Sequence, residues 1–134
     1  ALSLPLVGCG GGRASDTLEP EGGYVAPVTD TRPLVAEITG VETHATRTGT
    51  IVRAFGDPGQ EGFWDPDLVN VTPTGDDSGT VTFEFRVRPP VSPEPAGTRA
   101  SRSLDAATFL SVARLREVER IEIVGAGGSR TLRP

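Results

Sequence analysis

The segment Thr80–Arg88 constrains the fold more than any other part of the chain. Its apolar residues Val81, Phe83, Phe85 and Val87 alternate strictly with polar or charged residues. Successive side chains of a β-strand point to opposite faces of the sheet, so this period of two predicts a strand with one dry face and one wet face. An antiparallel sheet that covers a core on one side has this pattern. The segment therefore indicates a β protein.

Shorter segments before it have β character as well. Apolar and polar residues alternate from Leu34, and the apolar phase changes after Gly40, which is typical of a β-bulge. A second strand is predicted over Thr48–Phe55. A third is predicted over Leu68–Thr72, because Asp65-Pro66-Asp67 and Pro73 bound it. The turn residues Gly75–Gly79 favour a hairpin between this third strand and the next.

The part of the chain after Arg88 is less regular. Four prolines within Pro89–Gly97 predict a loop or a crossover between sheets. Thr98–Leu104 is compatible with a strand. Ser103–Arg116 leaves two alternatives open, a short helix capped by Ser103 or a strand over 108–112 followed by a helical turn over 113–118, and we favour the second. Two more strands are predicted over Arg120–Val124, with Ile121 and Ile123 inward, and over Ser129–Leu132.

Seven or so short strands spaced in this way predict an antiparallel β-sandwich, immunoglobulin-like in size. The alternative is a small β-barrel. The chain has one cysteine and one tryptophan, so the Cys–Trp–Cys core of antibody domains is absent and the similarity is one of architecture alone.

The start of the chain carries a different kind of signal. The apolar residues Ala1–Leu6 lead into Leu6-Val7-Gly8-Cys9, where a small residue precedes the cysteine. This stretch resembles the lipobox of bacterial lipoproteins, and the chain resembles small periplasmic lipoproteins that are uncharacterised. The resemblance implies cleavage before Cys9, a lipid on its sulfur and acylation of the new amino terminus. Gly10 after the cysteine implies, by the sorting preference of this class, a location in the outer membrane facing the periplasm.

These features divide the chain into three parts. Residues 1–8 are interpreted as the tail of a truncated signal peptide. Residues 9–30 are interpreted as the lipidated cysteine and a flexible tether, because they are rich in Gly, Glu and Pro and lack an apolar period. Residues 31–134 are interpreted as the β-sandwich domain. The expected localisation is the cell envelope, with the membrane as a partner through the lipid anchor.

Catalytic residues are not indicated by the sequence. His44 is the single histidine, and nucleophilic catalysis by serine or cysteine usually needs a histidine base. We interpret His44 as a surface histidine on a strand. One His and one Cys are too few for a His/Cys zinc site. We therefore expect no enzyme activity, no catalytic residues, no metal and no cofactor.

The candidate ligand-binding residues are Phe63, Trp64, Asp65 and Asp67. Two aromatic residues in a loop beside carboxylates are typical of a stacking platform for sugar rings. Loop carboxylates are also the ligands that Ca²⁺ prefers. The interpretation that we favour is that Trp64 folds back to plug the open end of the sandwich and that the Asp residues are turn formers.

The charge of the chain narrows the choice of partners. The net charge is −5, although the part after Ala96 is basic and the part before it is acidic. An acidic chain behind a membrane is a poor partner for nucleic acid. The expectation is a lipid-anchored, non-catalytic binding or assembly module that contacts an envelope protein or a glycan.

Overall fold

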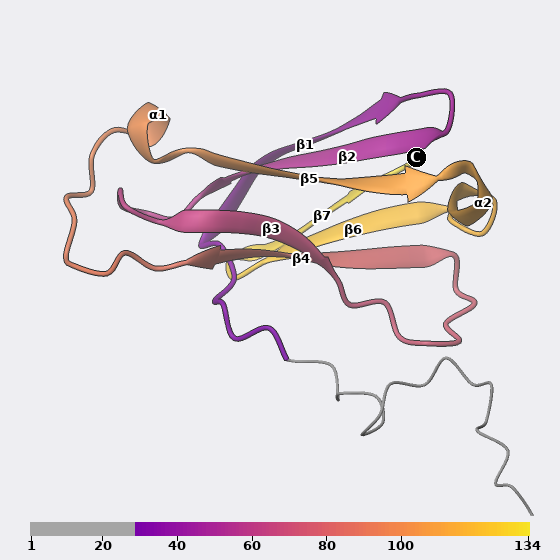
Figure 1. The fold of residues 1–134 in the computed structure, drawn as a ribbon, viewed down its shortest axis with the longest axis horizontal. Helices are drawn as coiled ribbons and strands as arrows, with labels where there is room; N and C mark the ends of the chain where they lie inside the picture. The colour runs from indigo at the N-terminus through magenta and orange to yellow at the C-terminus, as the bar shows by residue number, and fades with distance from the viewer. Residues whose placement is uncertain (1–28) are drawn as a thin grey trace, which may run out of the picture. The chain divides into compact units, whose positions relative to one another are not determined.

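A computed structural model describes residues 29–134. Residues 1–28 lie outside the described part, and with them the predicted signal peptide, Cys9 and nearly all of the predicted tether. Residues Thr31–Pro134 form one compact unit. Its strands make two separate sheets packed face to face (Figure 1), so the predicted β-sandwich is confirmed and the barrel alternative is wrong.

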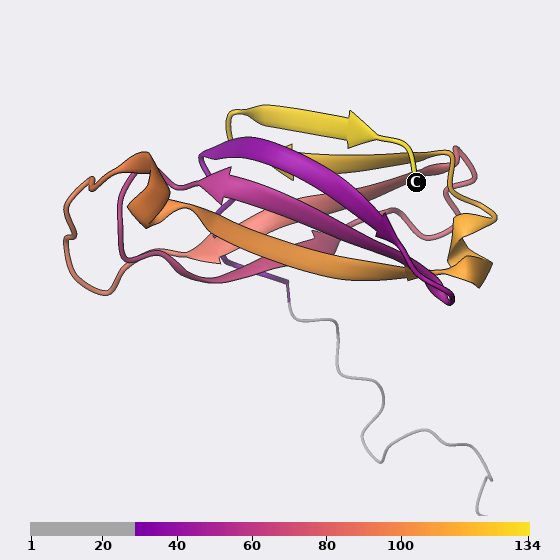
Figure 2. The ribbon, with the colours of Figure 1, turned by 90° about the horizontal axis from the view of Figure 1, so that it is seen from above.

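The first sheet has three antiparallel strands in the order β1-β2-β5. These strands are β1 (Glu37–Ala45), β2 (Gly49–Asp57) and β5 (Leu104–Ser111). The pairing of β1 with β2 shifts register between Ile38 and Gly40, which confirms the bulge predicted from the change of apolar phase. Figure 2, seen from above, shows β2 running between β1 and β5.

The second sheet has four strands in the order β3-β4-β6-β7. These strands are β3 (Trp64–Asn70), β4 (Thr80–Arg88), β6 (Arg120–Gly125) and β7 (Gly128–Leu132). The β3–β4 hairpin is antiparallel as predicted, but β4 and β6 run parallel because the chain passes through β5 between them. An immunoglobulin constant domain places its fourth strand in the other sheet. The similarity to that fold is therefore one of size and layers.

The core lies between the two sheets, and the apolar side chains of β4 form a large part of it. Val81, Phe83, Phe85 and Val87 are all buried, as their spacing predicts. Ile121 and Ile123 of β6 are fully buried beside them, also as predicted. The other buried apolar residues are Val35, Ile38, Val52, Ala54, Leu68, Ala106, Leu110 and Val118.

The residues just before β1 extend the second sheet. Strand β6 pairs with β4 only along Thr80–Glu84, so β6 leaves the second half of that edge of β4 unpaired. Val35 pairs with this part of the edge: its N–H donates to the Phe85 carbonyl at 2.8 Å. The Val35 carbonyl in turn accepts from Ala126 N–H at 2.8 Å. The fully buried Val35 thereby fixes the point where the chain enters the sandwich.

The predicted start of the third strand is wrong. The structure begins β3 at Trp64 and not at Leu68, so the strand runs through Asp65-Pro66-Asp67. Register shifts between Trp64 and Asp67, where β3 has one residue more than β4. Pro66 can lie in such a bulge on an edge strand, since no ladder hydrogen bond from its nitrogen is needed there.

The interpretation of Thr98–Leu104 as a strand is also wrong. Residues Arg99–Arg102 form the short helix α1, capped by Thr98. The N–H of Ser101 donates to Thr98 Oγ1 at 3.1 Å, and the N–H of Thr98 donates to Ser101 Oγ at 2.9 Å, a reciprocal capping box. The favoured alternative for Ser103–Arg116, a strand followed by a helical turn, is confirmed. Strand β5 is followed by the helical turn α2 (Val112–Leu115), but the strand starts earlier than expected.

Candidate functional site

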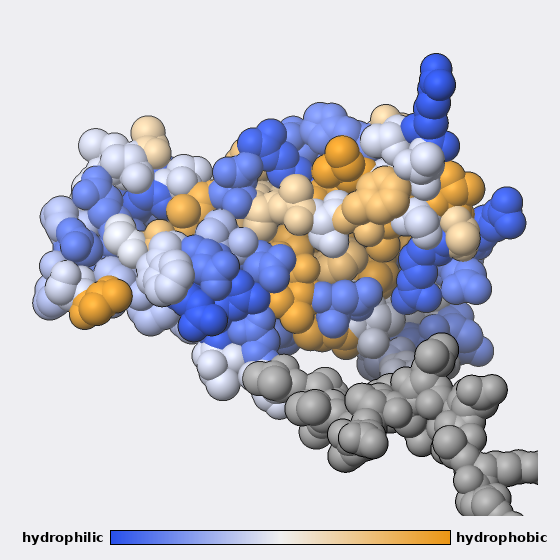
Figure 3. All heavy atoms as spheres, in the orientation of Figure 1, coloured by the Kyte–Doolittle hydropathy of each residue, from blue (hydrophilic) through white to orange (hydrophobic). Residues whose placement is uncertain are grey.

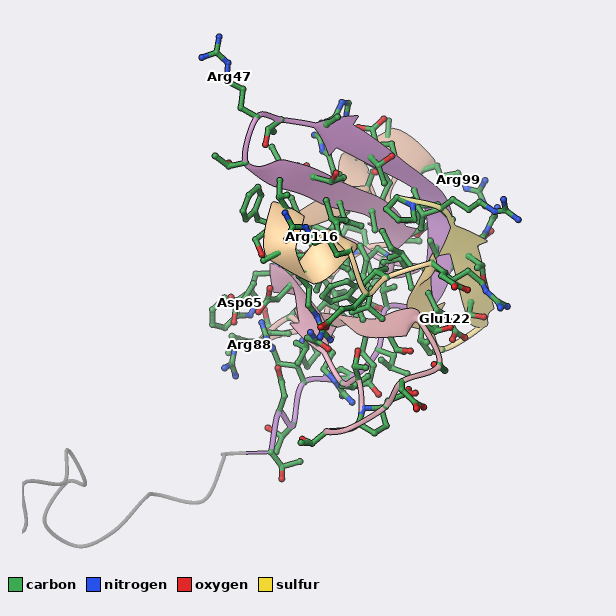
Figure 4. The ribbon with its side chains drawn as sticks, turned by 90° about the vertical axis from the view of Figure 1, so that its right-hand side faces the viewer. Arg47, Asp65, Arg88, Arg99, Arg116 and Glu122 are labelled. Atoms are coloured by element: carbon green, nitrogen blue, oxygen red, sulfur yellow. The ribbon has the colours of Figure 1, made fainter. Side chains whose placement is uncertain are left out.

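The bulge at the start of β3 organises the candidate site. Trp64 is the first residue of the strand, and its neighbour Asp65 has a backbone φ of 53°. This left-handed conformation is uncommon for residues other than glycine, but Asp adopts it more readily than most. The kink brings Asp65 beside Arg88, which lies at the end of the neighbouring strand β4 (Figure 4).

Two arginines hold the two aspartates of the site. Arg88 Nε donates to Asp65 Oδ2 at 2.9 Å. Arg32 Nη1 donates to the Asp65 carbonyl at 2.9 Å, and Arg32 Nη2 donates to Asp67 Oδ2 at 3.2 Å. The Arg32 side chain is only 11% exposed, so this network is anchored at its base. Two guanidinium groups and two carboxylates leave the network with no net charge.

The indole of Trp64 lies above this network. The Arg88 guanidinium carbon is 5.5 Å from the centre of its ring, a cation–π contact that fixes the indole from one side. Trp64 nevertheless remains 51% exposed. It borders a groove of about 340 Å³, whose lining residues are Thr31, Arg32, Pro33, Trp64, Arg88, Pro89 and Val91.

The favoured prediction, in which Trp64 plugs the end of the sandwich, is therefore wrong. Phe63 is the aromatic residue that packs against the core, and it is only partly buried. The two neighbours separate because β3 begins between them: successive side chains of an extended chain point to opposite faces. Of the four candidate residues, Trp64, Asp65 and Asp67 come together in one site, and Phe63 supports it from the core side.

The carboxylates of this site do not converge on a cation position. Asp65 and Asp67 each accept from an arginine, which already neutralises them. Within residues 29–134, no three His, Cys, Asp or Glu side chains gather in a way that could hold a metal ion. At these two aspartates the arginines occupy the place next to the carboxylate oxygens that a cation would need.

His44 lies away from this groove, on the edge strand β1. Its ring is 56% exposed, and Nε2 lies 3.0 Å from Glu42 Oε1. Glu42 is shared with Arg53, whose Nη1 is 3.7 Å away. Such contacts are typical of polar side chains on the exposed face of a strand.

Sequence reasoning missed Arg32, Arg88 and Pro33 as parts of the site. Arg88 ends the strictly alternating strand on its polar side, and the structure pairs it directly with Trp64. That pairing would follow from the hairpin if β3 had been extended back to Trp64. Arg32 offers no comparable signal, because it precedes the first strand and reaches residues more than thirty positions away.

Comparisons with known proteins add no relative: no protein-family model, curated protein or solved structure matches the chain. In the described part of the chain, no helix has the length and apolar character to cross a membrane.

Proposed function

We propose that this chain is a lipid-anchored, non-catalytic binding module of a bacterial cell envelope, held in the outer membrane and facing the periplasm. The anchor rests on the resemblance of Leu6-Val7-Gly8-Cys9 to a lipobox. The binding role rests on one observation, the half-exposed indole of Trp64 beside a groove. A large aromatic side chain left in water at a rigid site is a frequent feature of binding surfaces.

The ligand that suits this groove best is a neutral sugar ring. The apolar face of a pyranose stacks on an indole, while its hydroxyl groups need both donors and acceptors nearby. Arg88, which lines the groove, supplies donors, and Asp65, which is paired with Arg88 just outside the lining, supplies an acceptor. With this ion pair intact the two groups carry no net charge, so they give a charged ligand no net electrostatic attraction.

The experiment that tests this site is a calorimetric titration of the chain with neutral oligosaccharides, using N-acetylglucosamine oligomers and cello-oligosaccharides as probes. Trp64→Ala should weaken binding by about tenfold or more, because stacking and burial of the ring are lost. Phe109→Ala is the matched control, since Phe109 is a similarly exposed aromatic residue on another strand. Absence of binding by the parent chain, or equal losses in both variants, would contradict a glycan site at Trp64.

The anchor has a separate test. Intact-mass measurement of native protein should show Cys9 as the first residue, carrying a diacylglyceryl group and an acyl chain. Two or more chains give firm membrane attachment, whereas one chain holds weakly. In detergent phase separation the native protein should enter the detergent phase and Cys9→Ser the aqueous phase. An unmodified Cys9 thiol in native material would overturn the anchor and leave the test of the groove unaffected.

A further inference from the structure

The β1–β2 hairpin end of the three-stranded sheet exposes a small apolar surface. Ile51 is 37% exposed and Phe109 is 49% exposed, and the two are direct cross-strand partners of β2 and β5. Val112, the first residue of α2, is 43% exposed, and its N–H donates to the Thr48 carbonyl in the turn at 2.9 Å. We call these three residues, Ile51, Phe109 and Val112, the hairpin patch. Figure 3 shows apolar residues on the β5 side of the molecule near this end.

The position of Phe109 has a local cause. A Cβ atom built on Gly49 would lie 2.7 Å from Phe109 Cζ, so the ring reaches over the glycine at the base of the hairpin. An aromatic ring that covers a cross-strand glycine is held in place by the sheet. Phe109 is therefore presented to solvent by a rigid strand and does not turn into the core.

Among the described residues, two arginines beside the hairpin patch have no ion-pair partner, whereas the carboxylates of this end, Asp76, Asp77 and Glu117, gather around Arg114 of α2. Arg47 in the β1–β2 turn and Arg116 at the end of α2 are exposed, and neither forms an ion pair with another residue of 29–134. Figure 4 shows Arg47 projecting away from the body of the sandwich. The nearby Arg114 is partly compensated, with Nη1 3.4 Å from Glu117 Oε2.

The carboxylates on the same face of the sheet form ion pairs with another arginine, further from the β1–β2 turn. Arg53 holds Asp105 at 2.6 Å and Glu42 at 3.7 Å, and both pairs lie beyond Ile51 as seen from the turn. The hairpin end of this face therefore combines exposed apolar side chains with free guanidinium groups.

We propose that the hairpin patch and Arg47 and Arg116 dock on the surface of an anionic phospholipid bilayer. Apolar side chains at such a surface enter the region between headgroups and acyl chains, while arginines bind the lipid phosphates. This contact is made by the folded domain itself. It is separate from the covalent anchor at Cys9 and from the groove at Trp64.

The size and shape of the surface favour a bilayer over a protein. A stable protein interface buries roughly 800 Å² on each partner. The hairpin patch consists of three side chains, each less than half exposed, around a projecting turn. A projecting corner offers a second protein little area, but it can enter the interfacial layer of a bilayer, which deforms around it.

The test uses the full chain with Cys9→Ser, so that no covalent lipid contributes. The chain is sedimented with vesicles of phosphatidylglycerol mixed with phosphatidylcholine, and with vesicles of phosphatidylcholine alone. Binding should require the anionic lipid and weaken as salt is raised. Adding Arg47→Gln and Arg116→Gln together should lower the affinity by about thirtyfold, which is roughly fivefold for each arginine. Phe109→Ser should lower it at every salt concentration.

The matched control is the pair Arg99→Gln and Arg130→Gln, which removes the same charge from α1 and β7, outside the hairpin patch and outside the groove at Trp64. It should leave the affinity within about twofold of the parent, because arginines beyond a Debye length from the membrane contribute little. Thermal unfolding of each variant confirms that it is folded. Failure of the parent to bind anionic vesicles, equal binding to neutral vesicles, or equal losses in the two double variants would overturn the proposal. None of these results depends on a glycan binding at Trp64.

Discussion

Arg102 Nε donates to Asp57 Oδ1 at 2.7 Å, which ties helix α1 to the last residue of β2. The Asp57 side chain is only 5% exposed, whereas that of Arg102 is 20% exposed. The carboxylate also accepts from Gly59 N–H at 2.8 Å, and Arg99 Nε lies 3.4 Å from its Oδ2. One buried carboxylate thus fixes the turn after β2 and the end of the proline-rich connection.

We expect Asp57→Asn to lower the free energy of unfolding by about 2 kcal/mol, because the buried side chain loses a charge-assisted hydrogen bond from Arg102. Asp105→Asn is the matched control, since Asp105 pairs with Arg53 on the exposed sheet face. Its cost should stay below about 1 kcal/mol. Urea unfolding of the three chains measures both effects, and equal costs would show that burial of Asp57 adds nothing.

The same carboxylate should make stability depend on pH. The hydrogen bond from Arg102 lowers the pKa of Asp57 below its ordinary value; burial opposes this, and Gly59 and Arg99 reinforce it. Because the folded-state pKa is below the unfolded value of about 3.9, the charged form stabilises the fold above that pH. The contribution is lost as pH falls through the folded-state pKa. The difference in unfolding free energy between parent and Asp57→Asn should therefore be constant near neutral pH and shrink in acid; a difference that grows in acid would contradict this assignment.

Gly56 is predicted to tolerate no side chain. A Cβ atom there would lie 2.8 Å from Val35 Cγ2 and 3.2 Å from the Phe85 ring. Gly56→Ala should therefore cost about 2 kcal/mol by overpacking the core, measured as a lower midpoint of urea unfolding. At Gly40 in β1 the same added atom would meet Phe55 at an ordinary 3.5 Å. Gly40→Ala should leave stability unchanged or slightly raised, and a similar loss at both sites would argue against the close approach of Val35.

Trp64 is the single tryptophan, so its fluorescence reports on the groove directly. The folded chain should show emission typical of a partly solvated indole and should be quenched readily by acrylamide, since the side chain is 51% exposed. Arg88→Ala should increase quenching further, because the guanidinium at 5.5 Å covers one side of the ring. Emission typical of a buried indole, unaffected by acrylamide, would contradict the exposed position of Trp64.

Elements with a strong local pattern could be predicted from the sequence. The strand Thr80–Arg88 was predicted with its observed bounds, and the bulge beside Gly40 was predicted from a change of apolar phase. In both, neighbours along the chain decide which face of a strand is buried. The bounds of β3 and α1 were missed, because Asp65-Pro66-Asp67 and Thr98–Leu104 adopt conformations that depend on partners elsewhere in the fold.

The candidate site was predicted in part. Trp64, Asp65 and Asp67 could be chosen because residue types with binding chemistry stand together in the sequence. The pairing of their carboxylates with arginines could not be predicted, because Arg32 and Arg88 lie 33 and 23 positions from Asp65 in the sequence. The sequence around Asp65 and Asp67 does not show whether arginines or other carboxylates surround them in the fold. Carboxylates that cluster together attract a cation, whereas carboxylates that are paired with arginines do not.

The amino-acid sequence alone determined the all-β class, the inward face of the strands and the turns between several of them, because these follow from the alternation of neighbouring side chains and from Gly and Pro. The tertiary structure decided that β4 lies beside β6, that Asp57 meets Arg102 and that Trp64 stays exposed above Arg88. Each of these contacts joins segments that only the pairing and packing of the two sheets bring together, and no period within a single segment encodes them.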